Sequence, residues 1–170
     1  MTEASRPRLP LTGGCPCGAI RYEVTTLPLS LYACHCTDCQ RQSGSSFALN
    51  MPVSTAALRI TRGVTKGWRH TSPSGAAVVS HFCAECGGRV YGERDGRPES
   101  INLRAGTLDD TMWLQPVAHF FTRSAQHWER LSPDDALCFE GMPDATLGGA
   151  SLEWRAKLSD GAKTASDDRA

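Results

Sequence analysis

Hydrophobic and polar residues alternate in several short stretches of this chain. The clearest is "AIRYEVTT" at residues 19–26, where Ile20, Tyr22 and Val24 are separated by polar positions. A period of two is typical of a strand with one buried face. Similar runs follow at residues 30–34, 46–53, 57–61, 66–70, 77–83, 89–93 and 100–105. Turn-forming stretches such as "SPSG", "RDGRP" and "CGG" separate several of them, which predicts a mainly β domain of short strands.

Helical patterns are few and short. One turn of helix is expected at residues 37–44, another at 108–113, and a third at 124–131 with Ser124 as its N-cap. From about residue 145 the chain becomes polar and rich in Gly, Ala and Ser. The predicted organisation is a flexible N-terminus at residues 1–11, one domain at 12–144, and a polar, disordered tail at 145–170 with at most a short helix at 151–158.

Composition and charge exclude several classes of partner. The chain has 170 residues, with 18 Lys and Arg against 18 Asp and Glu, so its formal net charge is zero. Such a chain has no bulk electrostatic attraction to nucleic acid or to anionic lipid. No stretch approaches the roughly 18 apolar residues of a membrane helix, and the first residues lack the apolar core of a signal peptide. We therefore expect a cytoplasmic protein with neither nucleic acid nor a membrane as its partner.

Cysteines are the main chemical signal in the sequence. There are eight, at positions 15, 17, 34, 36, 39, 83, 86 and 138. Because the cytosol keeps thiols reduced, clustered cysteines indicate metal or redox chemistry there, rather than a disulfide framework. Seven of the eight are clustered and are interpreted as metal ligands. Cys138 stands alone between apolar neighbours in "ALCFEG" and is expected to be a small buried hydrophobic residue.

The spacing of these seven cysteines suggests how they divide between ions. Cys15 and Cys17 are two apart, so an extended chain places both thiols on one face. Cys83 and Cys86 form "CAECGG", a C-x-x-C turn typical of structural zinc sites. The segment "CHCTDC" combines both spacings, so that one ion can bind all three of its cysteines: Cys34, Cys36 and Cys39.

The simplest division is four ligands plus three. The two pairs together make a closed four-thiolate site, for which zinc is the favoured ion, and the remaining three make a site with an open position. Closed sites are typical of structural zinc and open sites of catalytic zinc. An alternative joins Cys36 and Cys39 to the C-x-x-C pair and leaves the other three unused. His35 could be a fourth ligand of the open site, although an extended chain turns its side chain to the opposite face.

The charge of the open site limits its chemistry. Three thiolates on a divalent cation leave a net charge of about −1, so the ion would be a weak generator of hydroxide. Zinc nevertheless holds a coordinating thiol as thiolate. A thiol substrate therefore suits such a site better than a hydrolytic water.

Four segments, in this order, resemble a known family: "GGCPCGAIRY", "CHCTDCQRQSGSSF", "HFCAECGGRVY" and "INLRAGTLDD". The chain resembles the glutathione-dependent formaldehyde-activating enzymes, whose domain also occurs in centromere protein V, over roughly residues 12–130. The resemblance implies a single β-tent-like domain of short antiparallel strands with two zinc ions. It implies a structural ion on Cys15, Cys17, Cys83 and Cys86, and a catalytic ion on Cys34, Cys36 and Cys39. The chain lacks the basic N-terminal extension of the centromere type.

The same resemblance implies an activity. The expected reaction is that of a carbon–sulfur lyase, which joins the thiol of glutathione, or of a related thiol, to formaldehyde or another small aldehyde, as in S-hydroxymethylglutathione formation. Arg41 and Arg104 are candidates for binding an anionic substrate, and His119 is a candidate for lining the site. Two rival hypotheses remain open: a non-catalytic two-zinc binding or scaffolding module, and a thiol redox sensor that loses zinc on oxidation.

Overall fold

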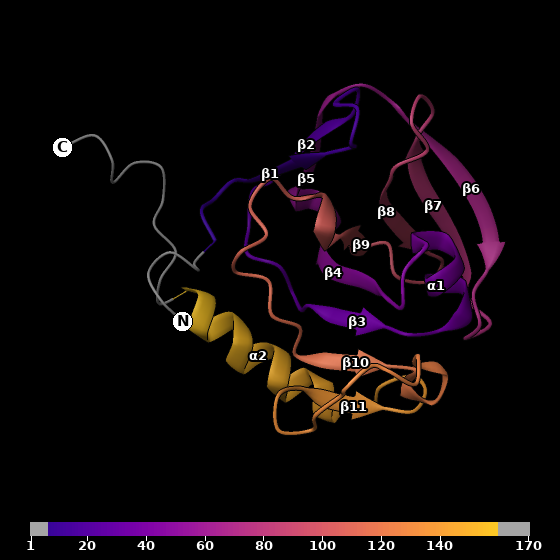
Figure 1. The fold of residues 1–170 in the computed structure, drawn as a ribbon. Helices are drawn as coiled ribbons and strands as arrows, with labels where there is room; N and C mark the ends of the chain where they lie inside the picture. Colours follow the sequence, from indigo (N-terminus) through magenta and orange to yellow (C-terminus); the bar gives the residue numbers. More distant parts are fainter. Residues whose placement is uncertain (1–6, 160–170) are drawn as a thin grey trace.

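The computed structural model describes residues 7–159, and within them the chain forms two sheets (Figure 1). The smaller sheet has three antiparallel strands in the order β1 (Leu11–Gly14), β2 (Arg21–Val24) and β5 (Leu58–Arg62). In the larger sheet the order is β11 (Leu137–Phe139), β10 (Ala118–Phe120), β3 (Tyr32–Cys34), β4 (Ala48–Ser54), β9 (Ser100–Arg104), β8 (Arg89–Arg94), β7 (Ala77–Cys83) and β6 (Thr65–Thr71). The mainly β fold class predicted from the alternating pattern is confirmed.

Most strand pairs are antiparallel, with two exceptions at one edge. Strand β10 pairs parallel with both β3 and β11. Strands β1, β10 and β11 were not predicted from the sequence. Each has only three or four residues, and none lies within a longer alternating run like residues 19–26 around β2.

Two α-helices accompany the strands in the described part of the chain. Helix α1 (Thr37–Ser43) lies beside β4, in the angle between the β3–β4 and β6–β7 parts of the large sheet (Figure 1). It ends at Gly44, whose φ of 63° is the left-handed conformation that glycine adopts at a helix C-terminus. The other two predicted helical turns are wrong: residues 108–113 and 124–131 form no helix, although short 3-10 turns precede them at Ala105–Thr107 and Thr122–Ser124.

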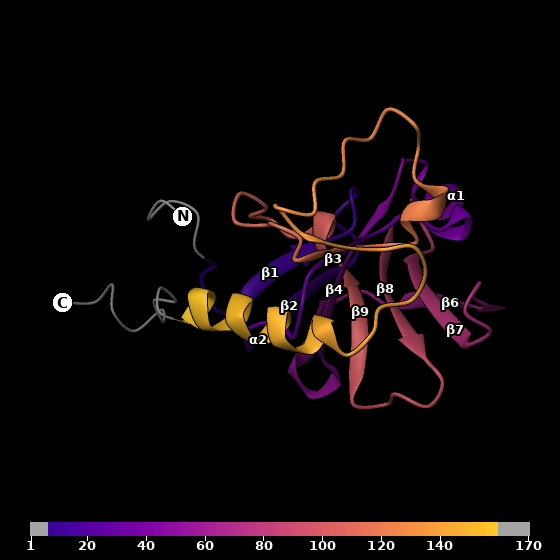
Figure 2. The same cartoon turned by 90° about the horizontal axis from the view of Figure 1, so that it is seen from below.

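Helix α2 (Thr146–Ser159) corrects the expectation of a disordered tail from residue 145. Its buried residues are Ser151, Trp154 and Leu158, which share one helical face because they are three and four positions apart. Trp154 stacks on Trp113, and the Ser151 hydroxyl lies 2.9 Å from that of Ser30. Figures 1 and 2 show α2 on the side of the domain away from α1 and β6–β7. The rest of the expected tail, residues 160–170, lies outside the described residues.

The main apolar core lies between the two sheets and α2. Its fully buried members come from both sheets and include Val24, Met51, Val53, Val90 and Leu103. Part of the N-terminal segment that was expected to be flexible also belongs to this core, because Leu11 is buried at the start of β1. A second cluster of buried residues contains Cys34 and Cys36 with Ala118, Phe120 and Phe121. One group of cysteines is therefore embedded in a separate apolar environment.

Candidate metal centres

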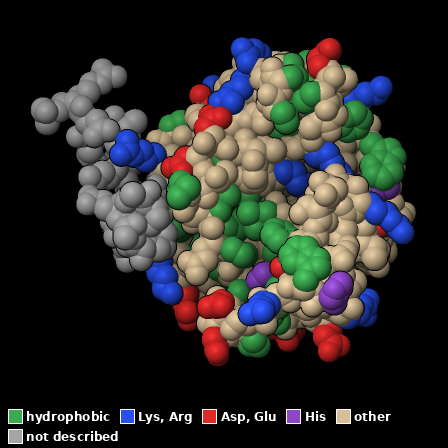
Figure 3. Space-filling view, in the orientation of Figure 1, with side chains coloured by type: hydrophobic (Ala, Val, Ile, Leu, Met, Phe, Trp, Pro, Cys, Tyr) green, Lys and Arg blue, Asp and Glu red, His purple; other side chains and the backbone are tan. Residues whose placement is uncertain are grey.

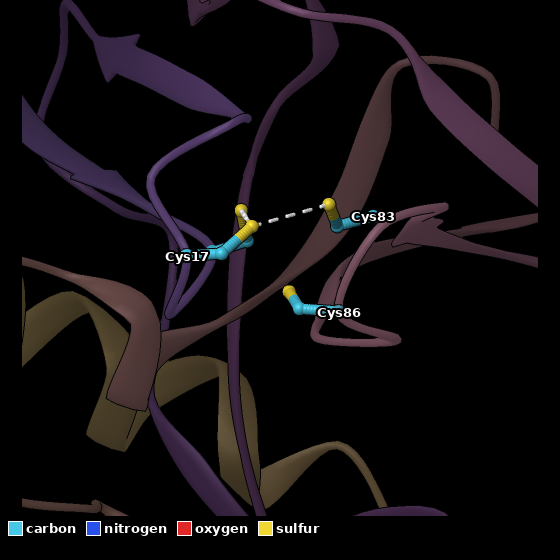
Figure 4. Close-up of side chains that lie close together, drawn as sticks. Cys17, Cys83 and Cys86 are labelled. Carbon is cyan, nitrogen blue, oxygen red and sulfur yellow. Dashed lines mark hydrogen bonds between the residues drawn. The ribbon is translucent and has the colours of Figure 1, made fainter.

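Cys15, Cys17, Cys83 and Cys86 form a four-cysteine cluster in which all the sulfur atoms lie within 4.8 Å of one another. The first two lie in the turn between β1 and β2, and the others at the end of β7 and in the turn before β8. Figure 4 shows the thiols of Cys17, Cys83 and Cys86 pointing toward a common centre. The Sγ atoms of Cys15 and Cys17 are 3.5 Å apart, and those of Cys17 and Cys83 are 3.8 Å apart.

These separations fit a tetrahedral metal ion. Zinc–sulfur bonds of about 2.3 Å place tetrahedral ligands roughly 3.8 Å from one another. The surrounding backbone is shaped to the cluster. Gly87 has a φ of 71°, and a Cβ atom on Gly88 would lie 2.6 Å from Pro16 and 3.3 Å from the sulfur of Cys86. The four-cysteine cluster is thus built to hold a metal ion, and it would join the small sheet to the large one.

Local hydrogen bonds favour the thiolate form of Cys15, one of the two buried members of this cluster. Burial raises the pKa of Cys15. The N–H of Ile20, which lies 3.2 Å from its sulfur, and the neighbouring thiols outweigh this effect and lower the pKa to about 6. A cysteine with this pKa is largely thiolate at neutral pH, which is the form that binds metal.

Cys34, Cys36 and Cys39 form a three-cysteine cluster, again with all sulfurs within 4.8 Å. Cys34 ends β3, Cys36 is the N-cap of α1, and Cys39 lies in its first turn. The sulfur of Cys36 accepts a hydrogen bond from the N–H of Cys39, so it also holds the start of the helix. The cysteines therefore group as four plus three, and the alternative division with Cys36 and Cys39 in the other cluster is not the one observed.

The three thiols cannot all ionise readily without a cation. Hydrogen bonds from Cys34 and Cys39 lower the pKa of Cys36, whereas hydrogen bonds with Cys36 and Cys39, together with burial, raise that of Cys34. Cys34 lowers the pKa of Cys39, but Cys36 and burial outweigh this effect and raise it to about 11. The thiolate of Cys36 is therefore favoured, whereas the raised pKa values of Cys34 and Cys39 oppose a second and a third thiolate in the cluster. A bound cation would remove this opposition, so the donor set fits a metal ion.

A half-open cavity of about 140 Å³ opens onto the three-cysteine cluster. This volume is smaller than the roughly 300–1,000 Å³ of sites that enclose a drug-sized ligand, so a larger substrate would extend past its open side. Aromatic side chains of Tyr32, Phe120 and Phe121 line it, together with polar residues from α1 and the sheet: Asp38, Gln42, Asn50, His70, Ser72, Ser74, Ser80, Arg94, Asn102 and Arg104. Figure 3, drawn in the orientation of Figure 1, shows basic side chains recessed in a hollow of the molecular surface. The four-cysteine cluster does not line this cavity.

The two candidate arginines differ in position. Arg104 lines the cavity, where its Nη1 donates to Asn50 Oδ1 and its Nη2 lies 3.4 Å from Gln42 Oε1. Arg41 does not reach the cavity: it is exposed and lines a separate hollow with Trp128 and neighbouring residues. The reason is helical geometry. Cys39 and Gln42, three residues apart, share the face of α1 that meets the cavity, and Arg41 lies between them on another face.

His35 lies behind the three-cysteine cluster and not among its ligands. It is completely buried, and its Nε2 lies 3.0 Å from Nδ1 of His119. Its backbone carbonyl accepts hydrogen bonds from Gln40 Nε2 and the Ser124 hydroxyl. Burial, and then His119, lower the pKa of His35, and burial lowers that of His119. Both rings are therefore neutral at neutral pH, and they brace the loop that carries the cysteines.

Sequence reasoning missed two of the polar residues in the cavity and misplaced one cysteine. Asn50 and Arg94 were not considered, although Asn50 interrupts the apolar run "SFALNMPV", and a polar residue at a buried strand position was the available signal. Cys138 was expected to be buried and is exposed. Its neighbours Leu137 and Phe139 face inward from the edge strand β11, so alternation turns Cys138 outward.

Comparisons with known proteins agree with this geometry. A family model described as "Glutathione-dependent formaldehyde-activating enzyme" matches residues 10–124, the segment that carries both clusters. A Halomonas elongata protein provisionally named as such an enzyme is 27% identical over 159 residues, covering 87% of this chain and 96% of the relative. A Sordaria macrospora protein with the same provisional name is 30% identical over 96 residues, covering 53% of this chain and 40% of that protein.

Among solved structures, one of a Rhodobacter sphaeroides protein matches with a TM-score of 0.49 and 24% identity, covering 59% of this chain and 90% of that one. The described helices of the present chain include none that is both long and apolar enough to cross a bilayer.

Proposed function

Because the chain belongs to the glutathione-dependent formaldehyde-activating enzyme family, we propose that it is a zinc-dependent carbon–sulfur lyase of the cytoplasm. Its substrates would be glutathione or a related thiol, and formaldehyde or another small aldehyde. Cys15, Cys17, Cys83 and Cys86 would hold a structural zinc ion, and Cys34, Cys36 and Cys39 a catalytic one. The observation that carries this proposal is the three-cysteine cluster, one ligand short of a closed site, which lines a half-open cavity.

The proposed reaction is a balanced addition. The sulfur of the thiol forms a bond to the carbonyl carbon of the aldehyde, the π electrons move to the carbonyl oxygen, and that oxygen takes up the proton that the thiol lost. Cys34, Cys36 and Cys39 would hold the zinc ion, which would supply a position where a substrate thiol is kept deprotonated. No oxidant or reductant is needed.

The chain's own residues would hold and enclose the substrates. The aromatic wall of Tyr32, Phe120 and Phe121 keeps water from part of the cavity, and Tyr32 and Phe120 stack with ring centroids 4.1 Å apart. Asn50 and Gln42 are neutral partners of Arg104, so they fix its guanidinium without cancelling its charge. The buried His35, paired with the half-buried His119, keeps the cysteine loop in place from behind.

The activity is tested by replacing one ligand of the open site. We expect Cys36→Ser to slow the formation of the hydroxymethyl thioether more than about 100-fold, because even changes to residues that merely support metal ligands cost 10–100-fold. Proton NMR exchange spectroscopy on an equilibrated mixture of thiol, aldehyde and their adduct would measure how much the enzyme adds to the spontaneous rate of interconversion. Cys138→Ser, which alters an exposed thiol outside both clusters, is the matched control and should retain full activity. A metal-loaded wild-type protein without any rate enhancement would favour a non-catalytic two-zinc module.

The two clusters should release metal at different chelator concentrations. A closed four-thiolate site resists ligand exchange, whereas an open three-thiolate site admits a competing ligand. Native mass spectrometry during a chelator titration should therefore pass from two zinc ions per chain to one, and only later to none. Simultaneous loss of both ions, or a single ion at saturation, would contradict the proposed division of roles.

A further inference from the structure

The floor of the cavity is one face of the large sheet, and strand register explains which residues it presents. Tyr32 on β3 pairs with Asn50 on β4, and Asn50 pairs with Arg104 on β9. A second row joins Asn102, Gly92 and Ser80, and a third row joins Arg94, Val78 and His70. All nine residues line the cavity. Because directly paired residues share a face, the register by itself brings two arginines to this floor.

The same register sets the spacing of these arginines. Asn102 and Gly92 are direct partners on antiparallel strands, Arg104 lies two residues beyond Asn102, and Arg94 lies two residues beyond Gly92. The two arginines therefore lie on opposite sides of this pair. At about 3.3 Å per residue their backbones are roughly 13 Å apart along the strands. An extended chain of three residues spans about 10 Å, so two arginine side chains that lean inward can reach both of its ends.

Neither arginine has an acidic partner among residues 7–159. Arg104 bonds only to the neutral amides of Asn50 and Gln42, and Arg94 makes no side-chain hydrogen bond or ion pair. Asp38 is the one acidic residue of the described chain in the cavity lining, and it forms no ion pair with either arginine. Two unpaired guanidinium groups in a half-enclosed space favour binding of anions.

We propose that Arg94 and Arg104 form a two-point carboxylate-binding surface that selects an extended thiol with a carboxylate toward each end. Arg104 binds the carboxylate beside the three-cysteine cluster, and Arg94 binds the distal one. This inference rests on the proposed function for the identity of the ligand as a thiol. It adds Arg94 as a specificity-determining residue and predicts that small uncharged thiols are poor substrates.

Binding of a non-reacting ligand tests this surface separately from catalysis. The probe is S-methylglutathione, which keeps both carboxylates but has a blocked sulfur, and its diester, which keeps the ammonium group but has no carboxylate, is the counterpart. By titration calorimetry on zinc-loaded wild-type protein, the diester should bind at least tenfold more weakly than the acid. Arg94→Gln should weaken binding of the acid by about tenfold to a hundredfold, as expected for losing a hydrogen bond to a charged group. It should also remove most of the difference between acid and diester.

Arg41→Gln is the matched control, because it removes an arginine from α1 that does not line the cavity, and it should bind the acid as wild type does. In the thiol-plus-aldehyde assay, Arg94→Gln should raise KM and leave kcat nearly unchanged. Equal binding of acid and diester by wild-type protein would overturn the proposal without any mutant. Charge-selective binding without carbon–sulfur bond formation would instead uphold the anion surface and refute the proposed enzymatic function.

Discussion

Cys83→Ser is expected to destabilise the whole domain, whereas Cys36→Ser should leave it folded. The four-cysteine cluster joins the turn after β1 to the end of β7, so an ion bound there would bridge the small and large sheets across 66 residues of sequence. Since the site does not exist in the unfolded chain, the free energy of metal binding is also free energy of folding. We expect the free energy of unfolding to fall by more than about 4 kcal/mol in Cys83→Ser.

The three-cysteine cluster spans only six residues and should matter less to stability. We expect Cys36→Ser to cost less than about 2 kcal/mol, mainly through loss of one metal ligand, because a serine side chain can still cap the start of α1. Thermal and denaturant unfolding of both variants, with metal analysis of each, measures the difference. Cys138→Ser should unfold as the wild type does. If Cys36→Ser unfolds as early as Cys83→Ser, the assignment of structural and catalytic roles to the clusters is wrong.

Trp154→Ala in α2 is expected to lower the free energy of unfolding by about 3–5 kcal/mol, the usual cost of removing a buried Trp side chain. Trp154 is 7% exposed and stacks on Trp113, so its removal leaves a cavity between α2 and the rest of the domain. Denaturant unfolding monitored by far-ultraviolet circular dichroism would measure the loss.

A control on the same helix separates burial from helix formation. Leu152 is 65% exposed, and Leu152→Ala should change the free energy of unfolding by no more than about 0.5 kcal/mol. If Trp154→Ala is equally mild, α2 contributes little to the stability of the domain. The predicted domain end at residue 144 would then include all of the stabilising core.

The division of the cysteines was readable from the sequence because most of the information is local. Spacings of two and three residues decide which thiols share a face or a turn, and counting ligands then gives four plus three. The eight-residue alternation around Tyr22 likewise identified β2, and the other longer runs identified the strands from β3 to β9. The strands and the spacings within each cysteine group depend on neighbours in the chain. The joining of Cys15 and Cys17 to Cys83 and Cys86 does not, because it links segments 66 residues apart and was predicted from the ligand count alone.

Other features were decided only by tertiary contacts. Helix α2 has just three buried positions in an otherwise polar segment, so composition suggested disorder until packing against Trp113 and Ser30 was known. The three-residue strand β10 owes its existence to parallel pairing with β3 and β11, because so short a run carries no periodic signal of its own.

The position of the arginines shows the same distinction at the site. Sequence proximity to the cysteines favoured Arg41, but helix geometry turns it away from the cavity. Arg94 is more than fifty residues from Cys39 in the chain and reaches the cavity through the register of β8 with β9 and β7. The sequence by itself determined the local grouping of the cysteines, since two- and three-residue spacings suffice to predict it. The walls and charge of the cavity come from pairing between distant strands, which only the tertiary structure could decide.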